Sequence, residues 1–178
     1  DSNSRLCMAS AVAAYVGSLG ANGPPTCYED VDVADLLLLV GSNTAEAHPV
    51  VFDRIKARRL ATGGSSPFLV VVDPRRTHTA EAADLHLPIA PGADVALFNL
   101  IAKRLLEANQ FDQAFASEHC SGLEEYARFL LDQDAAELAA AVDVDPTLLR
   151  TLIDRIARSR AMLSMYCMGL GQSTSGVA

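Results

Sequence analysis

Residues 36–44, which read Leu-Leu-Leu-Leu-Val-Gly-Ser-Asn-Thr, decide the fold of this chain. The first five form an uninterrupted apolar run, which is typical of a strand buried on both faces of a parallel sheet. A glycine ends the run, and the polar residues after it form a turn. Pro49 suits the first turn of a helix that follows. The stretch therefore predicts the strand, turn and helix from which α/β proteins are built.

The same unit recurs further along the chain. In the first helix, Val51, Ile55 and Leu60 are expected to form a stripe that faces the sheet. Phe68–Val72 is expected as a second buried strand, and residues 85–89 as an edge strand because a proline there cannot donate to a ladder. A long helix follows, with Asp94 expected as its N-cap.

The recurrence predicts an α/β domain in which a parallel sheet carries helices on both faces, as in Rossmann-like folds. Ligands bind such sheets beyond the carboxyl ends of the strands, where turns 41–44, 73–77 and 91–94 would lie. We expect one domain over residues 1–178. Its parts are an N-terminal segment (1–35), a βα nucleotide-binding core (36–110), a helical insert (111–160), and a terminal strand with its loop (161–178). The dipeptide at 145–146, aspartate then proline, predicts the start of the last helix of the insert.

Composition narrows the function classes. The chain has 178 residues and a formal net charge of −8, which argues against a nucleic-acid surface and against an anionic membrane as partner. Its longest apolar run, Leu36–Val40, is too short to cross a bilayer. Because it begins with aspartate, we expect it to be a piece of a longer protein. Its 4 cysteines lack Cys-x-x-Cys spacing, so they predict neither a zinc site nor an iron–sulfur motif.

Cys7 stands at the start of a helix of small residues expected over 6–18. A thiolate there suits a soft metal or a nucleophilic role, whereas many free cysteines only pack. Met8 and Met168 are ordinary core candidates, and His48 is expected to be structural because no second ligand stands at metal spacing.

Each polar residue in the expected turns could have either a ligand-binding role or a purely structural role. The turn that begins at Gly41 could hold a phosphate or be an ordinary βα turn. Asp73 could bond ribose hydroxyls or cap its turn, and Arg75 and Arg76 could offset a diphosphate or be solvated. Asp94 could accept from a guanine edge as well as cap its helix.

Taken together, several segments resemble the molybdopterin oxidoreductase superfamily. More narrowly, they are similar to the catalytic subunit of prokaryotic assimilatory and periplasmic nitrate reductases. The resemblance runs in order across nearly the whole chain. The segments are Asn-Ser-Arg-Leu-Cys-Met-Ala-Ser-Ala-Val (3–12), Cys-Tyr-Glu-Asp (27–30), Gly-Ser-Asn-Thr-Ala-Glu-Ala-His-Pro (41–49), Pro-Gly-Ala-Asp (91–94) and Met-Gly-Leu-Gly-Gln (168–172).

The resemblance implies a role for each matching position. Cys7 would be the protein ligand to molybdenum, with Met8 and Met168 beside the open position of the metal. Asn3, Met168 and Gln172 would contact the pterin. One guanosine dinucleotide arm would be held by Val40, Gly41, Ser42, Asn43, Thr44, Ala45, Glu46, Ala47, Asp73, Pro74, Arg75, Arg76, Thr77, Gly92, Ala93 and Asp94. Gly171 departs from the family, which usually has asparagine there.

The implied cofactor is molybdenum bis(molybdopterin guanine dinucleotide), with a 4Fe-4S cluster bound by a region upstream of this chain. The implied reaction reduces nitrate to nitrite by oxygen-atom transfer, with the electron donor left open. The isolated piece is expected to be inactive. A cytoplasmic location is expected, or a periplasmic one if the parent protein carries an export leader.

Three alternatives stay open. A formate dehydrogenase of the same superfamily would share the fold and the cofactor. A nicotinamide-binding domain would need a Gly-x-Gly-x-x-Gly turn, which the chain lacks after residue 40. A non-catalytic interaction module on a nucleotide-binding fold is the third.

Overall fold

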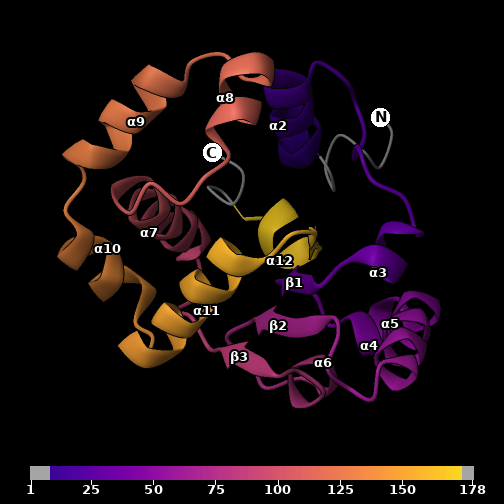
Figure 1. The fold of residues 1–178 in the computed structure, drawn as a ribbon. Coiled ribbons are helices and arrows are strands. Elements are labelled where there is room, and N and C mark those ends of the chain that lie inside the picture. Colours follow the sequence, from indigo (N-terminus) through magenta and orange to yellow (C-terminus); the bar gives the residue numbers. More distant parts are fainter. Residues whose placement is uncertain (1–8, 174–178) are drawn as a thin grey trace.

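The computed structural model describes residues 9–173, which form a parallel sheet flanked by helices (Figure 1). Its strands are β1 (Leu36–Val40), β2 (Phe68–Val72), β3 (Leu85–Leu87) and β4 (Met162–Tyr166). The helices before β3 are α2 (Ala9–Leu19), α3 (Asp30–Val33), α4 (Thr44–Ala47), α5 (Pro49–Ala61) and α6 (His78–Glu81). Those after it are α7 (Asp94–Glu107), α8 (Gln113–His119), α9 (Leu123–Asp132), α10 (Ala135–Val142), α11 (Pro146–Arg158) and α12 (Met168–Gly171). Within this described part, no helix is both long and apolar enough to span a membrane.

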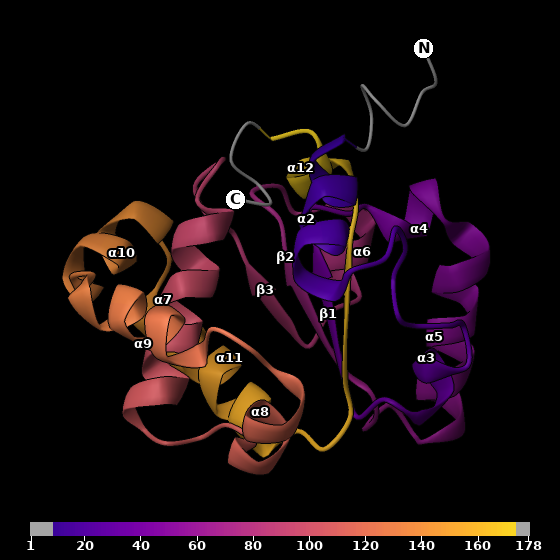
Figure 2. The same cartoon turned by 90° about the horizontal axis from the view of Figure 1, so that it is seen from above.

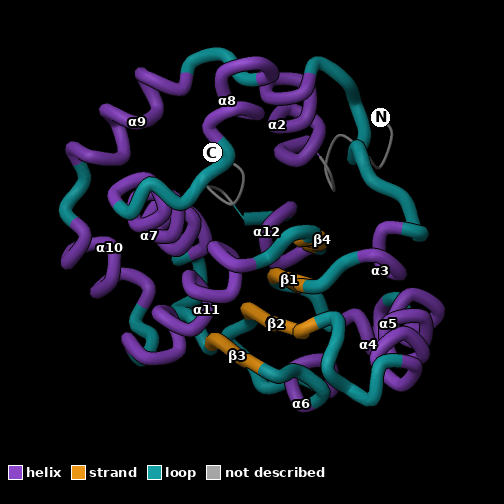
Figure 3. The backbone as a smooth tube through the Cα atoms, viewed as in Figure 1, coloured by secondary structure: helices purple, strands orange, loops and turns teal. Residues whose placement is uncertain are grey.

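The sheet has 4 strands in the order β3-β2-β1-β4, and every neighbouring pair is parallel (Figure 3). Leu36 lies opposite Phe68 on one side and Met162 on the other. The predicted α/β class with a parallel sheet is confirmed, and β3 lies at the edge as expected. β3 ends at Leu87, two residues before the predicted end.

β1 is buried on both faces, as its apolar sequence predicts. Leu36, Leu38 and Val40 pack with the cluster that includes α7 and α11, whereas Leu37 and Leu39 pack with Ile55 of α5 and its neighbours. Figure 2 shows the sheet between these two groups of helices. Each fully buried leucine contributes about 2 kcal/mol through removal of apolar surface from water.

The helix after β1 begins at Pro49, as predicted, but its buried stripe differs from the expected one. Ile55 is fully buried and Val51 is partly buried, whereas Leu60 is 83% exposed. The prediction for Leu60 was wrong because five residues beyond Ile55 carry the chain about 140° around the helix axis. Phe52, which was not expected in the stripe, is the other buried residue of this helix.

Helices α8 to α11 occupy most of residues 111–160 and form an arc around α7 (Figure 1). α11 begins at Pro146, and the carboxylate of Asp145 accepts a hydrogen bond from the Thr147 N–H at 2.7 Å, so this predicted helix start is confirmed. The buried Lys103 of α7 donates to the carbonyls of Leu130 and Leu131 at 3.2 and 3.1 Å. A cation at the carboxyl end of α9 compensates its unpaired carbonyls.

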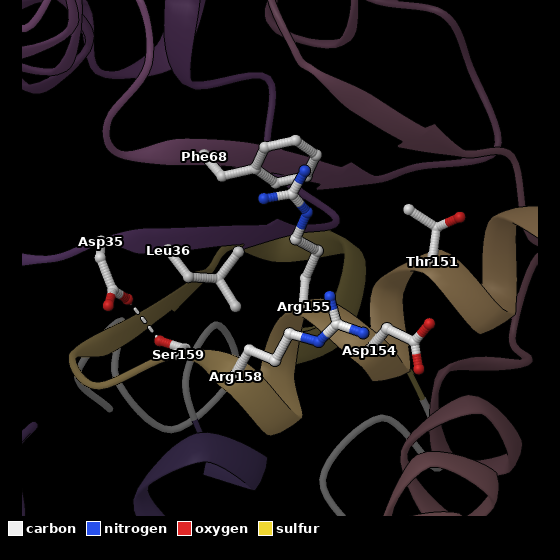
Figure 4. A pocket seen from close by; sticks show the side chains of 8 residues that line it. All are labelled: Asp35, Leu36, Phe68, Thr151, Asp154, Arg155, Arg158 and Ser159. Carbon is white, nitrogen blue, oxygen red and sulfur yellow. Dashed lines mark hydrogen bonds between the residues drawn. The ribbon is translucent and has the colours of Figure 1, made fainter.

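Asp35 joins the beginnings of three strands (Figure 4). Its backbone N–H donates to the Ala161 carbonyl at 3.0 Å, and its own carbonyl accepts from the Phe68 N–H at 2.8 Å. Its carboxylate accepts from the Ser159 hydroxyl and from the Arg160 N–H. Although burial raises the pKa of this carboxyl, these hydrogen bonds outweigh it and the pKa is lowered.

A cavity of about 380 Å³ lies beside Asp35. The guanidinium of Arg155 lies 4.0 Å from the centre of the Phe68 ring in its wall (Figure 4). Because Asp35 and Phe68 stand at the amino ends of β1 and β2, this cavity lies at the edge of the sheet opposite the predicted ligand site.

We expect Asp35→Asn to destabilise the protein by about 2 kcal/mol, because an amide N–H₂ would face backbone donors that now bond a carboxylate. Chemical denaturation measures this change. Asp154→Asn is the matched control, since Asp154 lines the same cavity and is exposed. It should change stability by less than about 0.5 kcal/mol. Equal effects in the two variants would contradict the role of Asp35.

Candidate functional site

The candidate site lies where the chain leaves β1 and β4 at the carboxyl edge of the sheet. β1 leads through α4 and α5 to β2 on one side, whereas β4 pairs with β1 on the other side. Such a reversal of strand order opens a crevice between the two outgoing chains. A cavity of about 620 Å³ lies there, which we call the switch-point crevice. Its lining comes from α2, residues 24–28, the turn after β1, α5, β4 and α12.

The two outgoing chains touch through glycines. The N–H of Gly169 donates to the Gly41 carbonyl at 3.1 Å, and the N–H of Gly41 donates to the Val72 carbonyl at 2.9 Å. Gly41 has a φ of +55°, in the left-handed region. A Cβ atom on Gly41 would lie 2.8 Å from the Gly169 Cα, and one on Gly169 would lie 2.6 Å from the Gly41 Cα. The close approach of these turns therefore requires glycine at both positions.

Hydroxyl groups organise the turn that follows Gly41. Ser42 and Thr44 are buried, and their hydroxyl oxygens lie 2.9 Å apart. The hydroxyl of Thr79, from α6, donates to the Asn43 side-chain oxygen at 2.9 Å and accepts from the Ala45 N–H at 2.9 Å. Because Thr79 is fully buried, these bonds fix the first turn against the second.

Aromatic side chains form another wall of the crevice. The rings of Tyr15 and Tyr166 lie 6.3 Å apart, which brings α2 against the end of β4. Burial, together with the Tyr15 hydroxyl, raises the pKa of Tyr166. Tyr166 is therefore neutral over the physiological pH range. Tyr28 lines the crevice as well, so flat rings surround much of the space.

The end of β4 brings a thiol and an imidazole together. Cys167 Sγ lies 3.6 Å from His48 Nε2, and both residues line the crevice. His48 separates α4 from α5, and its side chain makes no capping hydrogen bond. Sequence reasoning placed His48 as a structural residue and did not anticipate this contact, because the two residues lie 119 positions apart.

The second and third predicted turns lie further along the same edge. The carboxylate of Asp73 is buried and accepts from the Arg75 N–H at 2.8 Å, which is its predicted capping role. Asp94 is also buried, but it is the first residue of α7 and not its N-cap. The predicted N-cap was wrong, because the chain turns into the helix one residue earlier, at Ala93. Burial and the charge of Asp73 raise the pKa of Asp94.

Comparison with known proteins places the chain in a family. A family model described as molybdopterin oxidoreductase matches residues 1–178. The chain belongs to this family. It is 42% identical over 178 residues to a nitrate reductase of Shewanella frigidimarina, with 99% of this chain and 19% of the relative covered. It is 40% identical over 178 residues to a nitrate reductase of Synechocystis sp., with 100% of this chain and 25% of the relative covered.

Two further comparisons are informative. A formate dehydrogenase alpha subunit of Methanocaldococcus jannaschii is more distant, at 30% identity over 177 residues, with 99% of this chain and 26% of the relative covered. The solved acetylene hydratase from Pelobacter acetylenicus matches with a TM-score of 0.78 and 24% identity, over 95% of this chain and 22% of that chain. This likeness supports the fold alone. The chain spans a fifth to a quarter of the length of its nitrate reductase relatives.

The structure gathers only some of the residues that the family resemblance singled out. Ser42, Thr44 and Met168 line the crevice, whereas the other predicted residues of these segments do not: Val40, Gly41, Asn43, Ala45, Glu46, Ala47 and Gln172. The segments 73–77 and 92–94 do not line it; they lie beyond it along the sheet edge. Pro74, Arg75, Arg76 and Gly92 are exposed, and the Glu46 carboxylate pairs with the His78 imidazole at 2.9 Å. Asn3, Cys7 and Met8 lie outside the described residues.

The described part of the crevice fits a molybdopterin group. Its lining combines hydroxyls, aromatic rings and sulfur atoms, and it contains no aspartate, glutamate, lysine or arginine. A flat heterocycle with polar edges needs such surroundings. Among residues 9–173, no cluster of three or more His, Cys, Asp and Glu side chains could hold a metal ion.

Sequence reasoning missed Thr79, Tyr15 and Tyr166 as site residues. Thr79 lies in the short helix α6, and nothing in the neighbouring sequence indicates that its hydroxyl bonds the Asn43 side chain. The two tyrosines come from opposite ends of the chain, so only the tertiary structure pairs them.

We expect Gly169→Ala to destabilise the protein by about 2 kcal/mol, because the new methyl group would overlap the backbone of Gly41. Denaturant titration of the variant measures this loss. Gly171→Ala is the matched control from the same short helix, since a Cβ atom added there would meet nothing within 4 Å. If both alanines had the same effect, the close approach would not be the cause.

Asp94→Asn is expected to raise the melting temperature at pH 7 by about 2 °C. The folded chain holds the pKa of the Asp94 carboxyl above the value of about 3.9 that it has when unfolded. The free energy of unfolding therefore decreases as the pH rises from the unfolded pKa through the folded pKa of this carboxyl. Asparagine does not ionise, so the variant does not lose this stability. Thermal melts from pH 3 to pH 7 should show the advantage disappear below about pH 4. Asp154→Asn should show no such dependence; an equal gain there would contradict the prediction.

Proposed function

We propose that the protein of which this chain is a part reduces nitrate to nitrite with a molybdenum bis(molybdopterin guanine dinucleotide) cofactor. The observation that carries the proposal is the switch-point crevice. Its lining includes residues from two of the segments that resemble nitrate reductases, 41–49 and 168–172. The greater similarity to nitrate reductases than to a formate dehydrogenase supports nitrate as the substrate.

The described residues would bind and orient the cofactor. The hydroxyls of Ser42 and Thr44, held by their mutual hydrogen bond, offer polar contacts on one side of the crevice. Tyr15 and Tyr166 offer ring faces on another side, and their contact brings α2 against the end of β4. The contact between Gly41 and Gly169 fixes the distance between these two sides.

The turns at Asp73 and Asp94 would extend the site toward a nucleotide arm. Asp73 directly follows β2. In dinucleotide-binding folds an acidic side chain near the end of a strand bonds the ribose hydroxyls, and Asp73 would take this role. Asp94 is a buried carboxyl that would accept hydrogen bonds from the N–H groups of a guanine edge. When bound, the cofactor would supply the metal centre at which nitrate loses an oxygen atom.

The remaining parts of the proposal lie outside the described residues. Cys7 would be the ligand to molybdenum, and a 4Fe-4S cluster in an upstream region would deliver electrons. A chain that spans a quarter or less of its nitrate reductase relatives would supply only part of the cofactor cavity, so we propose that the isolated chain is inactive.

Cys7→Ser in the longer protein is expected to reduce nitrate reduction by more than about 100-fold, because a hydroxyl is a poor ligand for a soft metal. Nitrite formation with a reduced dye as donor measures the activity, and formate oxidation is assayed in parallel. Cys120→Ser is the matched control, since Cys120 is exposed and does not line the crevice. Wild-type turnover of formate without turnover of nitrate would contradict the proposal, as would full activity of Cys7→Ser.

A further inference from the structure

The Cys167–His48 pair has a place in the fold that packing does not explain. The thiol is half-buried and the imidazole is exposed, and they meet across the crevice edge at 3.6 Å. A cysteine that only packs is enclosed by apolar atoms, whereas this one shares a cavity of about 620 Å³ with a base. A thiol beside an imidazole is the arrangement that generates a nucleophilic thiolate.

The ionisable groups around the pair leave His48 as the proton acceptor. Besides the pair, Tyr15, Tyr28 and Tyr166 are the ionisable groups among the described residues that line the crevice. The helix that starts after Cys167 reads Met-Gly-Leu-Gly and brings no charge. The nearest carboxylate on α4, that of Glu46, pairs with His78 instead. Imidazole is thus the lining group that ordinarily titrates near neutral pH.

We propose that Cys167 is a reactive thiol, activated by His48, and that its modification closes the switch-point crevice to the cofactor. The second half rests on the proposed function. With an alkylating agent, the Sγ proton passes to His48 Nε2, the sulfur forms a bond to carbon, and the halide leaves. With a peroxide, the sulfur bonds to one oxygen and the O–O bond breaks. The cysteine is oxidised to a sulfenic acid, and the released hydroxide takes the imidazolium proton and becomes water.

The chain carries its own reference thiols. Cys27 and Cys120 are both exposed. The side chain of Glu29 raises the pKa of the Cys27 thiol. Cys120 follows His119, whose Nε2 lies 3.9 Å from the Glu118 carboxylate. If exposure alone controlled reactivity, both would be modified faster than the half-buried Cys167.

Iodoacetamide labelling of the longer protein, prepared without cofactor, tests the first half of the proposal. Mass spectrometry of the peptides that contain Cys27, Cys120 and Cys167 gives a separate labelling rate for each thiol. We expect Cys167 to react about tenfold faster than Cys27 at pH 7, because a neighbouring imidazole can accept the proton of its thiol. His48→Gln should reduce the Cys167 rate about tenfold, because the amide cannot accept the thiol proton as the imidazole does. Peroxide followed by dimedone should label the same peptide.

His119→Gln is the matched control, because it removes an exposed imidazole next to Cys120 and should leave the Cys167 rate unchanged. An unchanged thermal melt of His48→Gln shows that the variant is folded. A Cys167 rate that is insensitive to His48→Gln, or slower than the Cys27 rate, would overturn the proposal. Absence of dimedone labelling at Cys167 would overturn its oxidation.

Comparison of cofactor-loaded with cofactor-free protein tests the second half. Loaded protein should label at Cys167 at least tenfold more slowly, and prior alkylation should lower the molybdenum content of protein incubated with cofactor. If His48 controls the rate but the cofactor gives no protection, the reactive pair stands and the placement of the cofactor in this crevice fails. If Cys167→Ser protein loads cofactor after iodoacetamide treatment as poorly as treated wild type, modification of Cys167 is not what closes the crevice.

Discussion

The backbones of Gly41 and Gly169 meet at the carboxyl ends of β1 and β4, and the candidate site is arranged around that contact. A side chain on either residue would separate the first turn of the chain from its last strand. The hydrogen bond from the Gly169 N–H to the Gly41 carbonyl extends the β1–β4 pairing past the end of the sheet. Because both outgoing chains are held there, the crevice between them has a defined width. The width of the candidate site therefore depends on the absence of a Cβ atom from both glycines.

The electrostatics of the site differ from those of the whole chain. The net charge is −8, which would repel a cofactor that carries phosphates. The described crevice lining contains no carboxylate, and its polar groups are hydroxyls, an imidazole and a thiol. The two buried aspartates stand at neighbouring turns, where ribose and base contacts would be expected rather than phosphate contacts. This separation of charge allows an acidic protein to present a neutral cavity.

Much of the fold could be predicted from local patterns. The apolar run of β1, the proline that starts α5 and the Asp145–Pro146 helix start all act within a few residues, so the chain itself reveals them. Two predictions, those for Leu60 and Asp94, were wrong because the local pattern did not define the exact geometry of the helix. Leu60 points away from the sheet because the helix period carries it past the buried face. Asp94 enters α7 instead of capping it, because Ala93 takes the cap position.

The amino-acid sequence by itself determined the α/β class, the parallel sheet and the likeness to molybdopterin oxidoreductases, because hydrophobic runs and short motifs are local properties. Only the tertiary structure decided which turns share a cavity. It brought segments 41–45 and 166–171 together and left segments 73–77 and 92–94 outside the crevice. It also paired Thr79 with Asn43 and Cys167 with His48. Strand order sets these distances, and it depends on non-local pairing that no short window of sequence contains.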